Sequence, residues 1–83
     1  MSIFKKPSYT QKTTGMVINV EKSVGTFVLL TVKYVVGDSK YFLNQRVDTS
    51  LHKIEDVDIG NVFEVMYDKK DPNKAKIQKF EIQ

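Results

Sequence analysis

Two alternating stretches around Gly37-Asp38 constrain the fold of this 83-residue chain more than any other feature. Residues 26–36 and 40–47 place apolar side chains at every second position, which is the period of a β-strand. Glycine at the first central position favours a two-residue hairpin. With Val36 opposite Ser39, one face of this hairpin is almost wholly apolar. Its pairs are Tyr34 with Tyr41, Val32 with Leu43, Leu30 with Gln45 and Val28 with Val47.

Other loop lengths test this register. A three-residue loop would set Leu30 against Arg46 and Val28 against Asp48, and burying those charges is costly. A four-residue loop around a type I turn keeps the apolar facing and is equally compatible with the pattern. The sequence therefore predicts the pairing of the two strands, with the loop length open between two and four residues.

The apolar composition extends this prediction to the whole chain. Val and Ile supply 17 of the 34 apolar residues, Ala supplies one, and six Thr add further β-branched side chains. Such residues favour strands, whereas a helical domain would use Ala and Leu heavily. A chain of this size without disulfides relies on a tightly closed sheet or on self-association. We therefore expect an all-β fold.

The remaining strands follow from the same period. A first strand is predicted over 13–21 with Met16, Ile18 and Val20 as its apolar face, a fourth over 62–68 and a fifth over 75–82, after a turn at 71–74. The connection 48–58 has apolar residues spaced at roughly three, which predicts a short helical turn. The expected fold is a five-stranded, strongly curled antiparallel sheet or a small OB- or SH3-like barrel, with one helical turn between strands three and four.

The charge divides the chain into two parts. The net charge is +3, and Lys5, Lys6 and Lys12 are the ionisable side chains of the first fourteen residues, so residues 15–83 are neutral. We expect residues 1–12 to form a flexible basic arm and residues 13–83 to form a single β-barrel-like domain. A neutral domain argues against nucleic acid as the main partner, because nucleic-acid modules carry a basic face.

The inventory argues against catalysis and against cofactors or metals. The chain has no Cys and one His, which excludes disulfides, cysteine-ligated zinc and a cysteine nucleophile. The acidic residues near Gly60 lack the spacing of a calcium loop, and His52 is interpreted as an exposed loop residue. No apolar run reaches the roughly 18 residues of a membrane span, and the N-terminus lacks a secretory signal. We expect a soluble, cytoplasmic, non-enzymatic protein.

Three segments resemble one family. They are residues 15–20, residues 31–41 and, most specifically, residues 59–68 followed by Asp71-Pro72-Asn73-Lys74. This pattern resembles the bacterial domain-of-unknown-function family 3592, over about residues 15–82. Lys69 and Asp71 stand where that family usually has Pro and Asn. The resemblance implies a small β-barrel-like domain, here as a soluble stand-alone member, and implies no catalytic residues.

Binding is the function that the pattern favours. In the hairpin register the second face exposes aromatic, aliphatic and cationic side chains, which with the arm form the predicted partner-binding set. This set is Phe27, Leu29, Lys33, Phe42, Arg46, Lys5 and Lys6. We expect an interaction module that binds a protein or self-associates through the face or edge of strands two and three. The alternatives are a single-stranded nucleic-acid-binding OB-like module and a small inhibitor of an enzyme or toxin.

Overall fold

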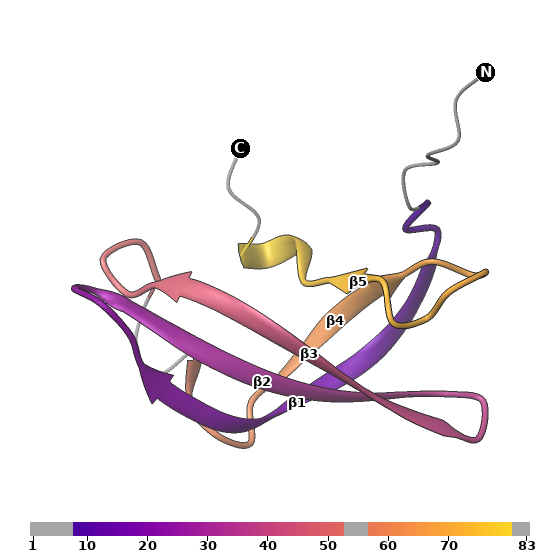
Figure 1. Cartoon of the computed structure of the whole chain (residues 1–83), viewed down its shortest axis with the longest axis horizontal. Helices are drawn as coiled ribbons and strands as arrows, with labels where there is room; N and C mark the ends of the chain where they lie inside the picture. Colours follow the sequence, from indigo (N-terminus) through magenta and orange to yellow (C-terminus); the bar gives the residue numbers. More distant parts are fainter. Residues whose placement is uncertain (1–7, 53–56, 81–83) are drawn as a thin grey trace.

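The computed structural model describes residues 8–52 and 57–80, and it folds them into one five-stranded antiparallel sheet (Figure 1). The strands lie side by side in the order β3-β2-β1-β4-β5. Their bounds are β1 Gln11–Lys22, β2 Phe27–Val36, β3 Ser39–Asp48, β4 Val62–Tyr67 and β5 Ala75–Lys76, and the 3-10 helix η2 spans Gln78–Phe80. The prediction of an all-β, curled antiparallel fold is confirmed.

The β2–β3 hairpin has the predicted register. Val36 pairs with Ser39 and the ladder continues without a break to Phe27 opposite Asp48. Gly37 has a φ of 61°, a left-handed conformation that glycine adopts without the steric cost of a side chain. The inward pairs of this hairpin supply four fully buried residues of the core. They are Leu30, Val32, Tyr34 and Val47.

The predicted apolar face of the first strand is wrong for Met16 and Ile18 and confirmed for Val20. Val17 is fully buried, whereas Met16 and Ile18 are 48% and 41% exposed. The register between β1 and β2 shifts between Val17 and Asn19, so Ile18 is the extra residue of a β-bulge. The bulge reverses which side chains face inward, and Val20 packs against the core beyond it. A strict period of two could not anticipate this reversal. β1 also begins at Gln11, two residues before the predicted strand.

The predicted fifth strand, 75–82, is also largely wrong. β5 has only two residues, which pair with Met66 and Tyr67 of β4. The chain then turns into η2, where the Phe80 N–H donates to the Ile77 carbonyl at 3.1 Å. Ile77 and Phe80 are both buried. Three-residue spacing on a 3-10 turn puts both side chains on one side, which an extended strand would not do.

Among the described residues of the connection, the helical turn expected between strands three and four is not found, and Val57 alone has 3-10 geometry. At its start, the Leu51 N–H donates to the Asp48 carbonyl at 3.0 Å and closes a tight turn. Residues 53–56 of the connection lie outside the described residues. The helical turn that the structure shows is η2 near the C-terminus. Asp48 and Ser50 bond locally at this point, which favours a turn over a helix.

Glycine 15 allows the sheet to curl tightly around its core. A Cβ at this position would lie 2.6 Å from Val32 Cγ1 and 2.7 Å from Val65 Cγ2. Those side chains belong to β2 and β4, the two neighbours of β1. Both are fully buried, so glycine is required where the neighbouring strands fold inward over β1.

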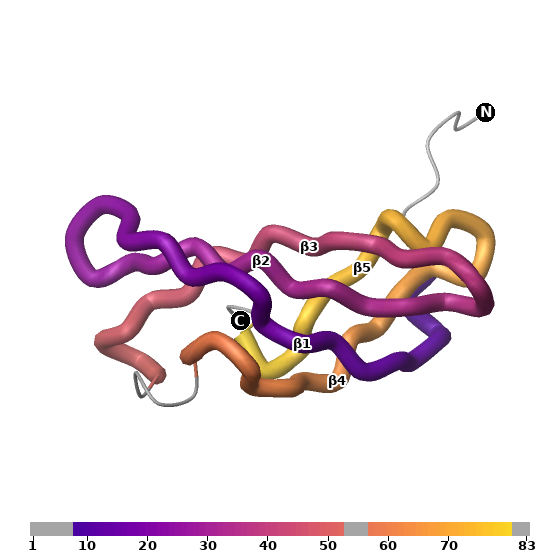
Figure 2. Tube along the Cα trace, turned by 90° about the horizontal axis from the view of Figure 1, so that it is seen from below, coloured from indigo at the N-terminus to yellow at the C-terminus, as the bar shows by residue number. Residues whose placement is uncertain are grey.

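The curled sheet forms a nearly closed barrel. β3 and β5 are its two edges, and no ladder joins them within the described residues. Figure 2 shows β5 lying between β3 and β4. One end of the opening is bridged by Tyr34, whose hydroxyl donates to the Pro72 carbonyl at 2.5 Å. Burial, together with Tyr41 and Asp71, raises the pKa of Tyr34.

Candidate functional site

The outer edge of β3 offers main-chain groups to a further strand. Residues that flank a two-residue hairpin turn form a hydrogen-bonded pair, and bonded pairs then alternate along the ladder. Val36 and Ser39 are such a pair. At the other end of the strands the Thr49 N–H donates to the Thr26 carbonyl at 2.9 Å, which is a bonded pair at the position that this alternation requires. The odd-numbered residues of β3 therefore bond to β2. The even-numbered residues from Lys40 to Arg46 direct their main-chain groups away from it.

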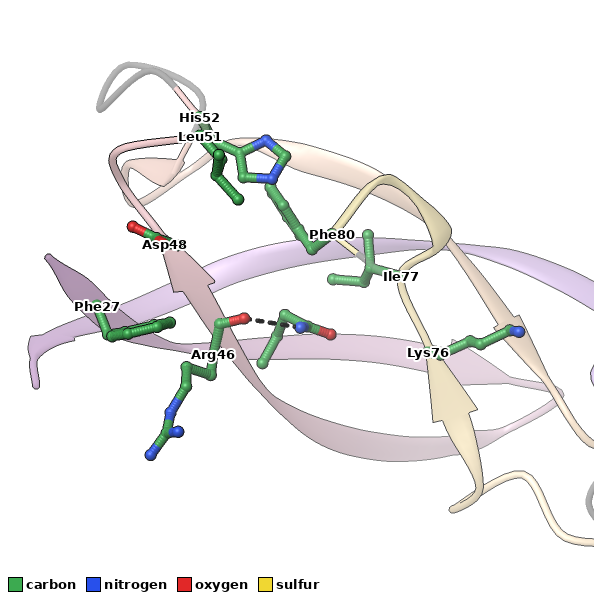
Figure 3. Close-up of a pocket in the computed structure, with 9 residues that line it drawn as sticks. Phe27, Arg46, Asp48, Leu51, His52, Lys76, Ile77 and Phe80 are labelled. Carbon is green, nitrogen blue, oxygen red and sulfur yellow. Dashed lines mark hydrogen bonds between the residues drawn. The ribbon is translucent and has the colours of Figure 1, made fainter. Parts of the chain in front are cut away.

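A cavity lies beside this edge, in the opening of the barrel. Its volume is about 330 Å³. β3, the turn that follows it, β5 and η2 contribute most of its wall, and Figure 3 shows these side chains. The lining residues are Phe27, Gln45, Arg46, Asp48, Leu51, His52, Lys76, Ile77 and Phe80. The apolar members lie close to exposed main-chain groups of β3, a combination that suits an extended peptide.

The Arg46 carbonyl on this edge is held by a side chain. Gln45 Nε2 donates to it at 2.9 Å (Figure 3). A carbonyl that points outward from an edge strand otherwise accepts a hydrogen bond from water or from the N–H of another strand. Gln45 therefore occupies an acceptor that an incoming strand would use. Its flexible side chain can leave at the cost of one exposed hydrogen bond, which a new strand would replace.

The end of the edge is fixed by Asp48. Its Oδ1 accepts hydrogen bonds from Thr26 Oγ1 at 2.6 Å, from Ser50 Oγ at 2.7 Å and from the Ser50 N–H at 3.0 Å. The Thr26 bond, followed by the Ser50 bonds, lowers the pKa of the Asp48 carboxyl. In Figure 3 the carboxylate points away from Ile77 and Phe80. Asp48 thus lies at the rim of the cavity, where its Oδ1 holds the shape of the turn.

The far wall of the cavity is aromatic. The His52 ring meets Phe80 edge-to-face, with 5.0 Å between the ring centroids, and Phe80 meets Phe63 in the same way at 4.9 Å. His52 is half-buried, so its interpretation as an exposed loop residue was too simple. The contact also joins the turn after β3 to η2, which bridges the second end of the opening.

Arg46 provides a cation at the mouth of the cavity, and Lys76 lines the cavity but directs its ammonium group outward. The Arg46 guanidinium lies over the Phe27 ring at 5.3 Å from its centroid. Lys76 Nζ lies 4.7 Å from the centroid of Tyr9, and Lys76 points away from His52 and Phe80 in Figure 3. Positive groups beside an apolar hollow favour a partner segment that combines apolar and acidic side chains.

The predicted partner-binding residues divide between this cavity and the outer face of the sheet. Phe27 and Arg46 line the cavity. Leu29, Lys33 and Phe42 lie on the outer face, where Phe42 pairs with Lys33 and is 57% exposed. Lys5 and Lys6 lie outside the described residues. Leu29 pairs with Arg46 and Lys33 with Phe42 on the β2–β3 ribbon, but only two of the seven predicted residues line the cavity. The rest of its wall comes mainly from η2 and from the turn after β3.

Sequence reasoning missed the residues that complete the cavity. Ile77 and Phe80 come from a segment far from β3 in sequence, whereas Leu51 and His52 belong to the turn directly after β3. One signal was present, since Ile77 and Phe80 stand three residues apart after a turn that Asp71 and Lys74 close with a 2.9 Å main-chain bond. Such spacing is typical of a helical turn with one buried side, but the prediction read it as a strand.

No family model, curated protein or solved structure matches this chain. The likeness of its motifs to family 3592 therefore stays a resemblance. In the described part of the chain no helix is both long and apolar enough to span a membrane.

Proposed function

We propose that this protein is a non-enzymatic interaction module that binds an extended segment of a partner protein along the outer edge of β3. The observation that carries the proposal is a ten-residue edge strand beside a cavity, with no ladder to the opposite edge among the described residues. Main-chain groups of such an edge pair with an added strand whatever its side chains, and an adjacent pocket selects one of them.

The two edges of the sheet differ in their fitness for this role. β5 offers two residues before the chain turns into η2, which is too short for a stable added strand. β3 offers four outward-bonding positions, at alternate residues from Lys40 to Arg46. The apolar wall formed by Ile77 and Phe80 would receive one apolar side chain of the bound segment, and Arg46 would attract an acidic one.

The arrangement gives less support to the nucleic-acid alternative. Phe27 and Phe42 would be its stacking platforms, but Phe27 is six positions along β2 from Lys33, the partner of Phe42. At about 3.3 Å per residue this is roughly 20 Å. The Arg46 guanidinium also covers the Phe27 ring. Consecutive bases cannot stack on both rings. An inhibitor of an enzyme or toxin would use the same edge, with the target as the strand donor.

The test combines peptide selection with a change in one main-chain group. A display library of random linear peptides is selected on the full chain, and affinities of the enriched peptides are measured by fluorescence polarisation. Asn44→Pro removes an outward N–H at the centre of the edge without removing a bond to β2. Asn44→Ala is the matched control, because it removes the same side chain and keeps the N–H. We expect Asn44→Pro to bind the enriched peptides at least tenfold more weakly than the wild type does, and Asn44→Ala to bind them as the wild type does.

Two results would contradict the proposal. One is the absence of any enriched peptide, and the other is equal binding by Asn44→Pro and the wild type. Amide NMR spectra of both variants verify that the sheet is intact. A titration with labelled single-stranded oligonucleotides at low salt serves as the comparison, since tight and steeply salt-dependent binding there would favour nucleic acid instead.

A further inference from the structure

The outer face of the sheet carries a group of exposed apolar side chains that the edge does not use. These residues, called the outer patch, are 41% to 57% exposed. They are Met16, Ile18, Val35, Phe42 and Val62. Met16 is outward because its neighbour Val17 faces the core, and Ile18 is the extra residue of the bulge that lets Val20 face the core as well. Isolated exposed apolar residues need no explanation, but a contiguous group usually marks an interface.

The registers place the outer patch in a row across four strands. Phe42 on β3 pairs with Lys33 on β2, Lys33 pairs with Met16 on β1, and Met16 pairs with Val62 on β4. A shallow hollow of about 300 Å³ lies over the middle of this row, lined by Met16, Ile18, Lys33, Val35 and Val62 among others. The row thus has an aromatic at one end, an aliphatic at the other and a hollow between them.

The next row ends in opposite charges. Val35 pairs with Lys40 on β3, and Thr14 pairs with Glu64 on β4. Gly15 opposite Tyr34 places Thr14 beside Val35 one step further along the ladder, so Lys40 and Glu64 stand at the two ends of one row. Both are exposed. Glu64 has a loose ion pair with Lys12, with 3.9 Å between Lys12 Nζ and Glu64 Oε1, which can yield to another cation.

We propose that two copies of this chain pack their outer patches face to face about a twofold axis that runs along the strands between β1 and β2. This axis sets β3 of one copy over β4 of the other, and β2 over β1. Phe42 then lies over Val62 of the second copy, Lys33 over Met16, and Lys40 over Glu64. Every contact occurs twice, because a twofold interface is self-complementary.

The pairing satisfies both the apolar and the charged groups of the face. Lys33 can lay its aliphatic stem on Met16 and keep its ammonium group at the rim. Packed sheets cross at about 30°, and β3 lies about 7 Å from the axis at a strand spacing of about 4.8 Å. The crossing therefore displaces Lys40 from Glu64 by roughly 4 Å, which these long side chains span. The patch is small, so we expect a dimer with a micromolar dissociation constant.

A second copy is the proposed occupant, because under this symmetry each Lys40 meets a Glu64 and the face is complementary to itself. A partner of uniform charge would leave either Lys40 or Glu64 facing a like charge. The inference does not rest on the proposed edge binding, since it uses the outer face rather than the edge of β3. Both surfaces can operate together, with two edges exposed in one dimer.

Charge-swapped variants test the symmetry directly. Lys40→Glu and Glu64→Lys are each expected to raise the dissociation constant of the dimer at least tenfold, because each homodimer would contain two like-charge contacts. Mixed in equal amounts, the two variants restore every contact and should dimerise as the wild type does. Sedimentation velocity over a concentration series measures all three samples, and Phe42→Ser should give a monomer.

The outcomes separate this interface from others. A wild type that stays monomeric to millimolar concentration overturns the inference, as does a mixture of swapped variants that remains monomeric. If Asn44→Pro abolishes the dimer while the charge swaps leave it intact, the copies associate through their β3 edges instead. All substituted positions are exposed, and circular dichroism verifies that each variant is folded.

Discussion

The two edges of the sheet are built in opposite ways. β3 is a ten-residue strand with a continuous ladder on one side, whereas β5 is a two-residue strand that ends in a buried 3-10 turn. The short edge uses its side chains for the core and leaves almost no main chain to pair. The long edge also contributes Val47 to the core, but it keeps a row of outward main-chain groups available. A sheet that blunts one edge while keeping the other limits strand addition to one place.

The opening between these edges is held at two points rather than closed by a ladder. Tyr34 reaches Pro72 at one end, and His52 meets Phe80 at the other. The cavity lies in this opening, next to the His52–Phe80 contact. Side-chain contacts can thus fix the spacing of two strands while their main-chain groups stay available.

The largest expected effect comes from the anchor of the short edge. Phe80 is 4% exposed, so Phe80→Ala should reduce the free energy of unfolding by about 3–5 kcal/mol through lost burial and a new cavity. Phe80→Leu keeps most of the volume and should cost less. Phe42→Ala is the control, because Phe42 is 57% exposed. At protein concentrations below the dissociation constant of the proposed dimer it should change stability by at most about 0.5 kcal/mol. Urea denaturation measures all three, and equal losses for Phe80→Ala and Phe42→Ala would contradict the comparison.

A second substitution tests whether Gly15 is needed for the tight curl of the sheet, which brings β3 and β5 close together. Gly15→Ala should lower the free energy of unfolding by about 1–3 kcal/mol, since the added methyl overlaps two packed valine side chains in the core. Thr14→Ala, at the exposed neighbouring position, should be close to neutral. Combining Gly15→Ala with Val65→Ala should cost less than the sum of the single changes. Full additivity would show that the contact with Val65 is not the cause.

The smallest expected effect comes from removing the hydrogen bond between the Tyr34 hydroxyl and the Pro72 carbonyl. Tyr34→Phe should cost about 1 kcal/mol at pH 7 through the lost hydrogen bond. The pKa of Tyr34 is raised in the folded state, so the unfolded chain loses this proton first, near pH 10. The hydroxyl's contribution is therefore present below pH 10 and disappears as the pH rises through the raised pKa. Denaturation at several pH values should show the wild type and the variant converging above pH 10, and a constant difference would contradict this assignment.

Much of the sheet was predictable because its information is local. The β2–β3 register follows from the Gly37-Asp38 turn and from the cost of burying Arg46 or Asp48. The turn closed by Asp71 and Lys74 was likewise predicted. The bulge at Ile18 was not, because its alternation of apolar residues reads as an unbroken strand. The cavity was not predicted, although two of its lining residues, Phe27 and Arg46, belong to the predicted partner-binding set.

The sequence by itself determined the class of fold, the hairpin register and the neutral charge of the domain. These depend on side-chain period, turn chemistry and composition, which act between near neighbours. The tertiary structure alone decided which side of β1 faces the core, where β5 ends and what lies beside the free edge of β3. Each of those outcomes depends on how the curled sheet accommodates Val32 and Val65 around Gly15 and how Ile77 and Phe80 fill the remaining space. Such packing joins residues far apart in the chain, so no local pattern contains it.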